Sequence, residues 1–212
     1  MTVPRPWDGG YRRCMAAASG ISVVSIAAVP WADVEAVFGT RGDPARCWCQ
    51  FFKMPNAEWW KSSDEEKSAR LRGQVTGGPV PPGLIAYLDG EPVGWCAIEP
   101  RTRYPLILRS KVVTTSSTEE PDDDSVWAVS CFVVRVGKRR KGVGQALAKA
   151  AVDWAREHGA RIIEGYPVDI EAKPEKVSSA ALYHGSVSIF EQAGFRVQAR
   201  PYPGRALVRL EL

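Results

Sequence analysis

The sequence predicts a single α/β domain in which helices flank a sheet. Apolar runs rich in β-forming residues alternate along the chain with stretches that carry apolar residues at helical spacing. The 212 residues, of which 45% are hydrophobic and 25% charged, can bury one sizeable core. No internal repeat and no long linker divides them. We therefore expect residues 1–18 to be a flexible leader and residues 19–212 to form the domain.

Local patterns predict the individual elements. Asp89-Gly90 lies between two apolar runs, which is typical of a β-hairpin, and the apolar run 126–134 predicts a buried central strand. Residues 142–158 carry apolar side chains at helical spacing, and the polar stretch 110–125 predicts a loop. In order, we expect a strand at 21–28, helices at 31–38 and 56–72, a hairpin at 84–88 and 93–98, a strand at 126–134, a helix at 142–158, a strand at 162–168, a helix at 182–193, and strands at 195–200 and 206–212.

Composition excludes several classes of protein. The longest mainly apolar stretch, 15–30, is interrupted by serines and is too short for a membrane helix. Arg12-Arg13 before it would suit a signal peptide, but its alternation favours a strand. Five cysteines, an odd number, do not indicate a disulfide framework, so we expect a cytoplasmic protein. A net charge of +4 is too small to indicate nucleic-acid binding, and we expect neither a nucleic-acid nor a membrane partner.

Charge is unevenly distributed, with an acidic run at 119–124 and a basic run at 135–141. The basic run leads into Arg139-Arg140-Lys141-Gly142-Val143-Gly144, where a buried strand turns into a helix. Free N–H groups at a helix N-terminus, glycines that allow close approach and flanking cations together suit a pyrophosphate. The spacing matches neither a Walker P-loop nor a dinucleotide fingerprint. A glycine-rich turn with a solvated basic face is the alternative interpretation.

Two motifs carry a resemblance to a known family. Arg139-x-x-Gly142-x-Gly144 resembles the acetyl-CoA pyrophosphate loop of the GNAT superfamily of N-acetyltransferases, and residues 190–195 resemble its C-terminal helix ending, usually Tyr-x-x-x-Gly-Phe. Residues 47–49, 94–96 and 164–169 further resemble a bacterial subgroup of that superfamily. The resemblance implies a mixed, mostly antiparallel sheet of about seven strands. It also implies that a splayed central pair of parallel strands forms an acyl-CoA cleft.

The same resemblance implies an activity and a binding site. A primary amine of a small molecule or peptide would attack the thioester of acetyl-CoA directly, and a backbone N–H of the central strand would stabilise the oxyanion. Acetyl-CoA would be the co-substrate, no metal is expected, and a homodimer is left open. A non-catalytic acyl-CoA sensor or interaction module is the alternative function. The cofactor-binding residues would be Phe132, Val133, Val134, Arg139, Arg140, Lys141, Gly142, Val143, Gly144, Gln145 and Ala146.

The sequence departs from the family at the position of the catalytic acid. The tyrosine that often protonates the leaving thiolate is replaced by Phe190, which has no proton to donate. Tyr183, two turns earlier on the same face of the expected helix, is the candidate acid, with Ser186 and Ser188 as weaker ones. A thiolate can also leave without an acid.

The general base is not fixed by a motif. Glu164 and Asp169 follow the 142–158 helix, and Glu99 ends the predicted hairpin, so each could accept the proton of an alkylammonium substrate. Capping of turns is the alternative role for Glu99 and Asp169. As a set, the three carboxylates would attract a cationic amine.

The segment that begins at Cys47-x-Cys49 is unusually rich in cysteine and aromatic residues. Two thiols do not make a zinc site without further ligands, so we expect no metal there. The aromatic side chains are expected to pack in the core or, alternatively, to line an acceptor pocket; they are Trp48, Phe51, Phe52, Trp59 and Trp60. Cys131 has no evident His/Asp partner and is expected to be a small buried residue.

Overall fold

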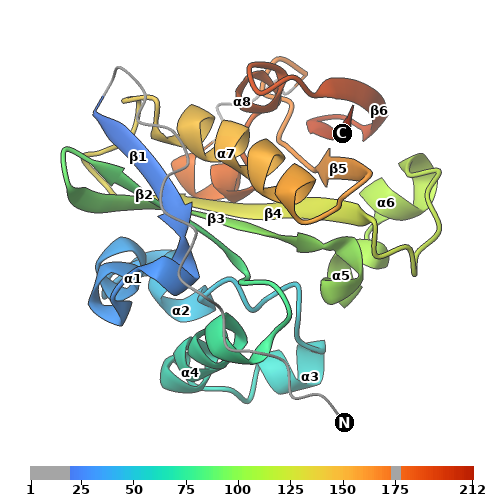
Figure 1. The fold of residues 1–212 in the computed structure, drawn as a ribbon. Coiled ribbons are helices and arrows are strands. Elements are labelled where there is room, and N and C mark those ends of the chain that lie inside the picture. Colours follow the sequence, from blue (N-terminus) through green and yellow to red (C-terminus); the bar gives the residue numbers. More distant parts are fainter. Residues whose placement is uncertain (1–19, 173–177) are drawn as a thin grey trace, which may run out of the picture.

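The computed structural model describes residues 20–172 and 178–212. The expected leader at 1–18 therefore lies outside the described residues. The described chain forms a seven-stranded sheet with the order β1-β2-β3-β4-β5-β7-β6, in which only the β4–β5 pair is parallel (Figure 1). This confirms the predicted mixed, mostly antiparallel sheet. The strands are β1 (Ile21–Ser25), β2 (Gly83–Leu88), β3 (Glu91–Pro100), β4 (Val126–Val134), β5 (Ile162–Gly165), β6 (Arg196–Tyr202) and β7 (Arg205–Glu211).

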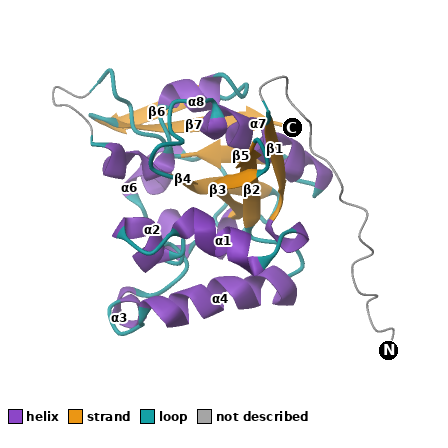
Figure 2. Cartoon of the chain, turned by 90° about the vertical axis from the view of Figure 1, so that its left-hand side faces the viewer, coloured by secondary structure: helices purple, strands orange, loops and turns teal. Residues whose placement is uncertain are grey.

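Helices cover both faces of the sheet. The α-helices are α1 (Trp31–Phe38), α2 (Gly42–Cys47), α3 (Asn56–Trp59), α4 (Asp64–Gly77), α5 (Pro105–Leu108), α6 (Lys111–Ser116), α7 (Val143–Glu157) and α8 (Val187–Glu191), and the 3-10 helices are η1 (Ile26–Ala28), η2 (Arg101–Arg103) and η3 (Ser179–His184). Helices α7 and α8 lie on one face, and α1 to α4 lie on the other (Figures 1 and 2). Among the described residues, no helix combines the length and apolar character that crossing a membrane requires.

Helix α7 forms the core of its face because its apolar side chains recur at helical spacing. Val143, Leu147, Ala151 and Trp154 are all buried against the sheet. Gly94 of β3 makes the close approach possible, since a Cβ there would lie 2.7 Å from Val143. The prediction of a 142–158 helix is confirmed, and Gly159 follows it with φ of 80°.

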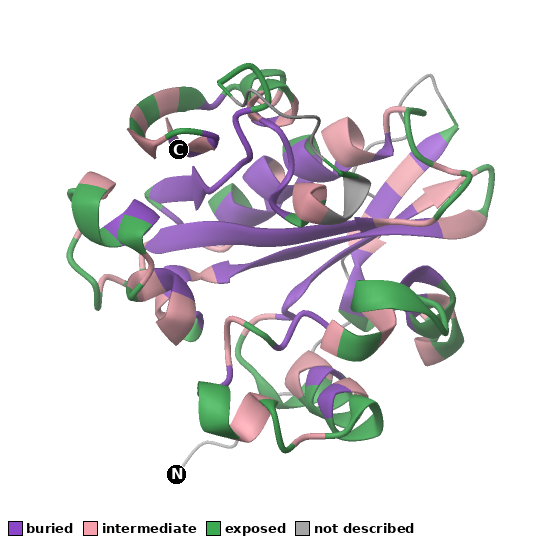
Figure 3. Cartoon of the chain, turned by 180° about the vertical axis from the view of Figure 1, so that it is seen from behind, coloured by how far each residue is buried: buried purple, intermediate pink, exposed green. Residues whose placement is uncertain are grey.

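The hairpin and the central strand also match their predictions. Asp89 and Gly90 both have positive φ, as the tight turn between β2 and β3 requires. Strand β4 spans Val126–Val134 as expected, and the central strands are buried along most of their length (Figure 3).

Several expected boundaries were wrong. The single helix expected at 56–72 is two helices, and α4 begins only after Ser63, whose hydroxyl and Glu66 form a capping box. The expected loop at 110–125 begins with α6. The strand expected at 21–28 turns into η1 after Ser25, and the strand expected at 162–168 ends at Gly165.

Candidate functional site

The centre of the sheet opens between β4 and β5. The two strands pair only as far as Val129 opposite Gly165, and no described strand pairs with residues 130–134 on that side. Strand β4 also carries a bulge, because Ala97 pairs with Cys131 and Ile98 pairs with Val129, which leaves Ser130 as the extra residue. The opening and the bulge together leave the second half of β4 without a described neighbouring strand on the β5 side, where η3 packs against it.

The basic loop after β4 is held partly by its own ion pairs. Glu91, at the start of β3, forms ion pairs with both Arg135 and Lys138. Arg139 turns back, and its Nε donates a hydrogen bond of 3.2 Å to the carbonyl of Val134. The side chains of residues 139–141 are exposed. These three cations, next to the start of α7, are therefore accessible to a ligand, although the Nε of Arg139 is already used within the loop.

The loop presents backbone N–H groups at its end. Gly142 has φ of 82° and caps α7, and the first N–H of the helix with a carbonyl partner is that of Ala146, which bonds Gly142. The N–H groups of residues 143–145 bond no carbonyl among the described residues. Gly144 faces α8, where a Cβ would lie 3.3 Å from Ile189. All the predicted cofactor-binding residues thus lie on one continuous path from the end of β4 into the first turn of α7.

Two of the predicted carboxylates flank the same residue of β4. Ala128 pairs with Glu99 of β3 on one side and with Glu164 of β5 on the other. Glu164 is fully buried, and its oxygens accept hydrogen bonds from Arg101 at 3.0 Å, Ser117 at 2.7 Å and Tyr166 at 3.0 Å. Burial first, and then the charge of Glu164, raises the pKa of Tyr166. Two of these three partners, Arg101 and Tyr166, are themselves buried.

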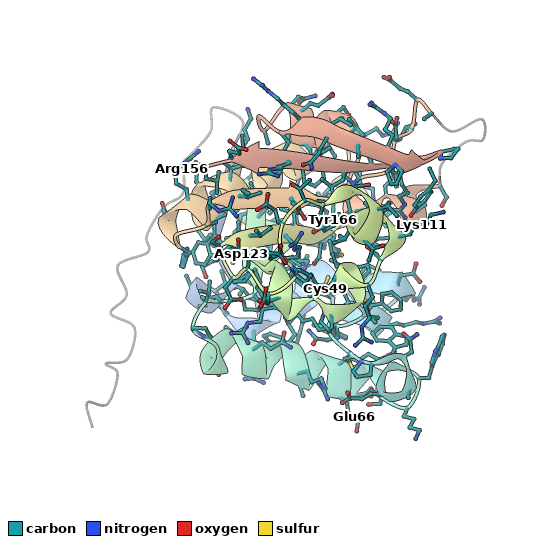
Figure 4. The ribbon with its side chains drawn as sticks, turned by 90° about the vertical axis from the view of Figure 1, so that its right-hand side faces the viewer. Cys49, Glu66, Lys111, Asp123, Arg156 and Tyr166 are labelled. Carbon is teal, nitrogen blue, oxygen red and sulfur yellow. The ribbon has the colours of Figure 1, made fainter. Side chains whose placement is uncertain are left out.

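Arg101, the partner of Glu164, is also wholly enclosed. Its side chain is 0% exposed, and it donates further hydrogen bonds to Ser117 and to the carbonyls of Glu119 and Glu120. Tyr166, labelled in Figure 4, is buried and joins this group through its hydrogen bond to Glu164. The arrangement is that of a buried structural ion pair.

Asp169 is placed beyond the end of β5. Its carboxylate forms a 2.6 Å ion pair with Arg200 of β6 and accepts a hydrogen bond from the N–H of Ala172. The hydrogen bond from Arg200 is the main cause that lowers the pKa of Asp169. This contact joins the C-terminal hairpin to the segment after β5.

Glu99 differs from the other two because it lines a cavity. The cavity has a volume of about 500 Å³ and lies between α4 and the end of β3. Glu99 forms an ion pair with Lys53 and accepts a 3.1 Å hydrogen bond from the hydroxyl of Tyr104. Burial and the charge of Glu99 raise the pKa of Tyr104, whereas contact with Ser130 lowers it. The group therefore connects the cavity to the bulge of β4.

The structure separates Tyr183 from the helix that carries Phe190. The expected helix at 182–193 is wrong, because Gly185, with φ of 77°, and Ser186 divide η3 from α8. Tyr183 and Phe190 therefore do not share a helix face. Tyr183 is 39% exposed, with its ring 6.4 Å from that of Phe52, while Phe190 is fully buried. A Cβ at Gly165 would collide with Phe190 at 2.4 Å, which shows how closely Phe190 packs on β5.

Sequence reasoning missed His184. Its ring is buried beside the backbone of Ser130 and lies tilted against the rings of Tyr183 and Phe52, with centroids 4.3 and 5.2 Å away. Burial, assisted by the charge of Arg205, lowers the pKa of His184 to about 3. No sequence signal marks this position, since the contact depends on where η3 lies against β4.

The cysteine and aromatic segment is mainly part of the core. Trp48 stacks on Phe38 with ring centroids 4.7 Å apart, and the thiol of Cys49 accepts a 3.1 Å hydrogen bond from the indole of Trp95. Cys49 lies inside the molecule (Figure 4), and Cys131 is buried in the same cluster. By contrast, Phe51 and Trp60 are exposed. Within the part of the chain that is described, no three potential ligands gather as a metal site would require.

Comparison with known proteins decides the family. The model of the acetyltransferase (GNAT) family matches residues 47–173, more than half of the chain. The chain belongs to the GNAT acetyltransferase family. In this GNAT protein the match includes the open strand β4, the glycine-rich loop and α7.

Solved structures agree with this GNAT fold. A GCN5-related N-acetyltransferase from Kribbella flavida is 20% identical, with 91% of this chain and 98% of that chain covered and a TM-score of 0.54. The yncA protein of Salmonella typhimurium, solved with its cofactor acetyl-CoA, is 14% identical, with 91% and 94% covered and a TM-score of 0.54. A ribosomal-protein-alanine N-acetyltransferase from Brucella melitensis is 16% identical, with 90% and 99% covered and a TM-score of 0.53. No curated protein matches the chain.

Proposed function

We propose that this GNAT protein transfers the acetyl group of acetyl-CoA to a primary amine of a small molecule or peptide. The observation that carries the proposal is the continuous path from the unpaired edge of β4 to the N-terminus of α7. An extended pantetheine arm can pair with a free strand edge, and a pyrophosphate suits the N–H groups and cations at its end. The bound acetyl-CoA of the yncA protein supports the same ligand.

The chain's own residues suggest how the ligand would be held. The backbone of Phe132 and Val134 faces the opening, and the N–H groups of residues 143–145 meet the pyrophosphate. Arg139, Arg140 and Lys141 add charge-assisted hydrogen bonds. With the pantetheine arm and the pyrophosphate held in this way, the thioester would lie at the bulge of Ser130.

In the reaction, the amine nitrogen forms a bond to the thioester carbonyl carbon and the carbon–sulfur bond breaks. Glu99 takes the proton of the ammonium group, directly or through water, since it is the predicted carboxylate that lines a cavity. A backbone N–H freed by the bulge next to Ser130 stabilises the oxyanion. Tyr183, exposed in η3, protonates the thiolate, and the second proton that the nitrogen loses as the amide forms restores the tyrosine through solvent. The ion pairs of Glu164 and Asp169 favour positioning roles for those two carboxylates.

The test is release of free thiol from acetyl-CoA with a broad panel of amines. Turnover with a member of the panel supports the transferase, whereas CoA binding without turnover of any amine supports the sensor. If Tyr183→Phe leaves the maximal rate unchanged at every pH, Tyr183 is not the acid.

A matched pair of glycine variants tests the binding loop. Gly142→Val and Gly159→Val place the same side chain at opposite ends of α7, at φ of 82° and 80°. The conformational strain is therefore similar. We expect only Gly142→Val to abolish CoA binding in calorimetric titration. Equal affinity in the two variants would contradict the assignment of the loop.

A further inference from the structure

The cavity beside Glu99 is preformed and has charged residues at its floor. Lys53 and Glu99 form that floor, and their side chains are only 10% and 9% exposed. One wall is α4, where Gly73 and Gly77 have open space in front of them and present no side chain. The cavity can therefore accept a ligand of several heavy atoms without moving the core.

The wall next to the floor is held in place. Gln74 of α4 exchanges two hydrogen bonds with the buried Gln50, at 2.9 and 3.2 Å, and accepts a third, of 2.9 Å, from Lys53. These bonds fix the distance between α4 and the segment that carries Lys53. The site is consequently preorganised.

Positive charge exceeds negative charge around the cavity. Lys53, Arg70 and Arg103 line it against the single carboxylate of Glu99, which Lys53 already neutralises. Arg103 is exposed and forms no ion pair within residues 20–172 and 178–212. Arg70 pairs with Glu58, and the two side chains are 45% and 42% exposed, so the pair is open to exchange with a ligand. Such an excess of guanidinium groups recognises a carboxylate or a phosphate.

The cavity is distinct from the proposed pyrophosphate loop. The register of β3 and β4 places Gly94 opposite Val134 and Glu99 opposite Ala128. The two cationic regions therefore lie at opposite ends of β4, about 20 Å apart along the strand. Ser130 lies between them, two residues or about 7 Å along the strand from Ala128. A ligand in the cavity thus approaches the bulge from the end that the pantetheine arm leaves free.

We infer that the acceptor of this GNAT protein is an amine that also carries an anionic group, a carboxylate or a phosphate. Arg103 and Arg70 bind the anionic group at the cavity wall, and the amine lies toward Glu99 and the bulge. The inference rests on the proposed acetyltransferase function and specifies its substrate class.

Matched amine pairs test the inference kinetically. β-Alanine is compared with propylamine, and O-phosphoethanolamine with 2-methoxyethylamine, so that each pair differs in its anionic group. We expect at least one anionic amine to exceed its neutral partner about ten-fold in kcat/KM, since a charged hydrogen bond contributes at that level. The pair with the larger ratio distinguishes carboxylate from phosphate. Equal or better use of the neutral amines would overturn the inference and leave the transferase intact.

Substitutions on the cavity wall are expected to change the KM for the anionic amine in opposite directions. Arg103→Gln and Arg70→Gln should raise KM for the anionic amine about ten-fold and leave the neutral amine unchanged. Glu58→Gln should lower that KM, because it releases Arg70 from its ion pair. Arg156→Gln is the control, since Arg156 is an exposed arginine on α7, across the sheet from α4 (Figures 1 and 4).

A binding measurement separates failure of the inference from failure of the proposed function. With CoA at saturation, so that the loop is filled, inorganic phosphate should raise the melting temperature of the wild type but not of the Arg70→Gln/Arg103→Gln double variant. The inference requires this shift in melting temperature whether or not any amine is acetylated. The absence of a shift in the wild type, or an equal shift in the double variant, would overturn the anionic site.

Discussion

Glu99 and Glu164 have similar neighbours but differ in how accessible their carboxylates are. Each flanks Ala128, each is paired with a cation, and each accepts a hydrogen bond from a tyrosine. The cation of Glu164 is an arginine sealed by further hydrogen bonds, whereas the lysine beside Glu99 stands at the floor of a cavity. The two carboxylates are of the same residue type and both are buried, so they differ mainly in access, and this difference is why we propose Glu99 rather than Glu164 as the base.

The largest expected effect separates the two carboxylates by activity. Glu99→Gln should lower kcat/KM for the best amine by about 10²- to 10⁴-fold, the usual contribution of a general base. CoA affinity should stay unchanged, because the loop lies at the other end of β4. Steady-state kinetics and calorimetric titration with CoA check the two parts. A decrease in kcat/KM smaller than about ten-fold would show that Glu99 is not the general base.

The second expected effect concerns stability. Glu164→Gln should lower the free energy of unfolding by about 3–5 kcal/mol, since it leaves the buried guanidinium of Arg101 without its counter-charge. Glu99→Gln should cost less, because water in the cavity can reach Lys53. Urea denaturation of both variants measures the difference. An equal loss in the two variants would mean that water in the cavity does not compensate Lys53 for the lost charge of Glu99.

A third difference should appear on acidification. His184, whose ring contacts Phe52, has a pKa of about 3, below its usual value of about 6.5. As pH falls below about 6.5, the unfolded chain binds this proton first, so stability is lost by up to about 1.4 kcal/mol per pH unit. Between about pH 7 and pH 5, His184→Gln should therefore lose less stability than the wild type. Parallel slopes in thermal melts would show that the histidine is not held neutral.

The smallest expected effect compares the two tyrosines. Tyr166→Phe removes a hydrogen bond from the sealed carboxylate and should cost about 1–3 kcal/mol, while Tyr104→Phe should cost less because its partner Glu99 lines the cavity and can accept a hydrogen bond from water instead. Chemical denaturation measures both. A larger loss for Tyr104→Phe would indicate that its contact with Ser130 supports the bulge.

The features that the sequence predicts well are contiguous in the chain. The loop 139–144 and helix α7 follow one another directly, so their glycines, cations and apolar spacing can be recognised together. The cavity is assembled differently, since Lys53 and Glu99 come from separate segments of the chain that only the tertiary fold brings together. Buried ion pairs are equally hard to predict from the sequence when their partners are distant in the chain, as are Arg101 and Glu164, which are 63 residues apart.

Two of the local errors have physical causes that are visible in the sequence. Gly185 interrupts the expected C-terminal helix by taking a positive φ, which removes the argument that placed Tyr183 on the face of Phe190. The Ser63 and Glu66 spacing of a capping box marks the true start of α4, whereas Asn56 begins only the short α3. In both cases a local backbone signal outweighs apolar spacing.

Helix α4 has a consequence for the motions of the protein. It buries only Lys67 and Leu71, and Gly73 lies in its interior, where glycine costs about 1 kcal/mol relative to alanine. Helix α7, with its many buried side chains, has no such weakness. We therefore expect the amide protons of α4 to exchange with solvent before those of α7. A ligand that fills the cavity would slow this exchange, so hydrogen exchange can report occupancy without any catalytic assay.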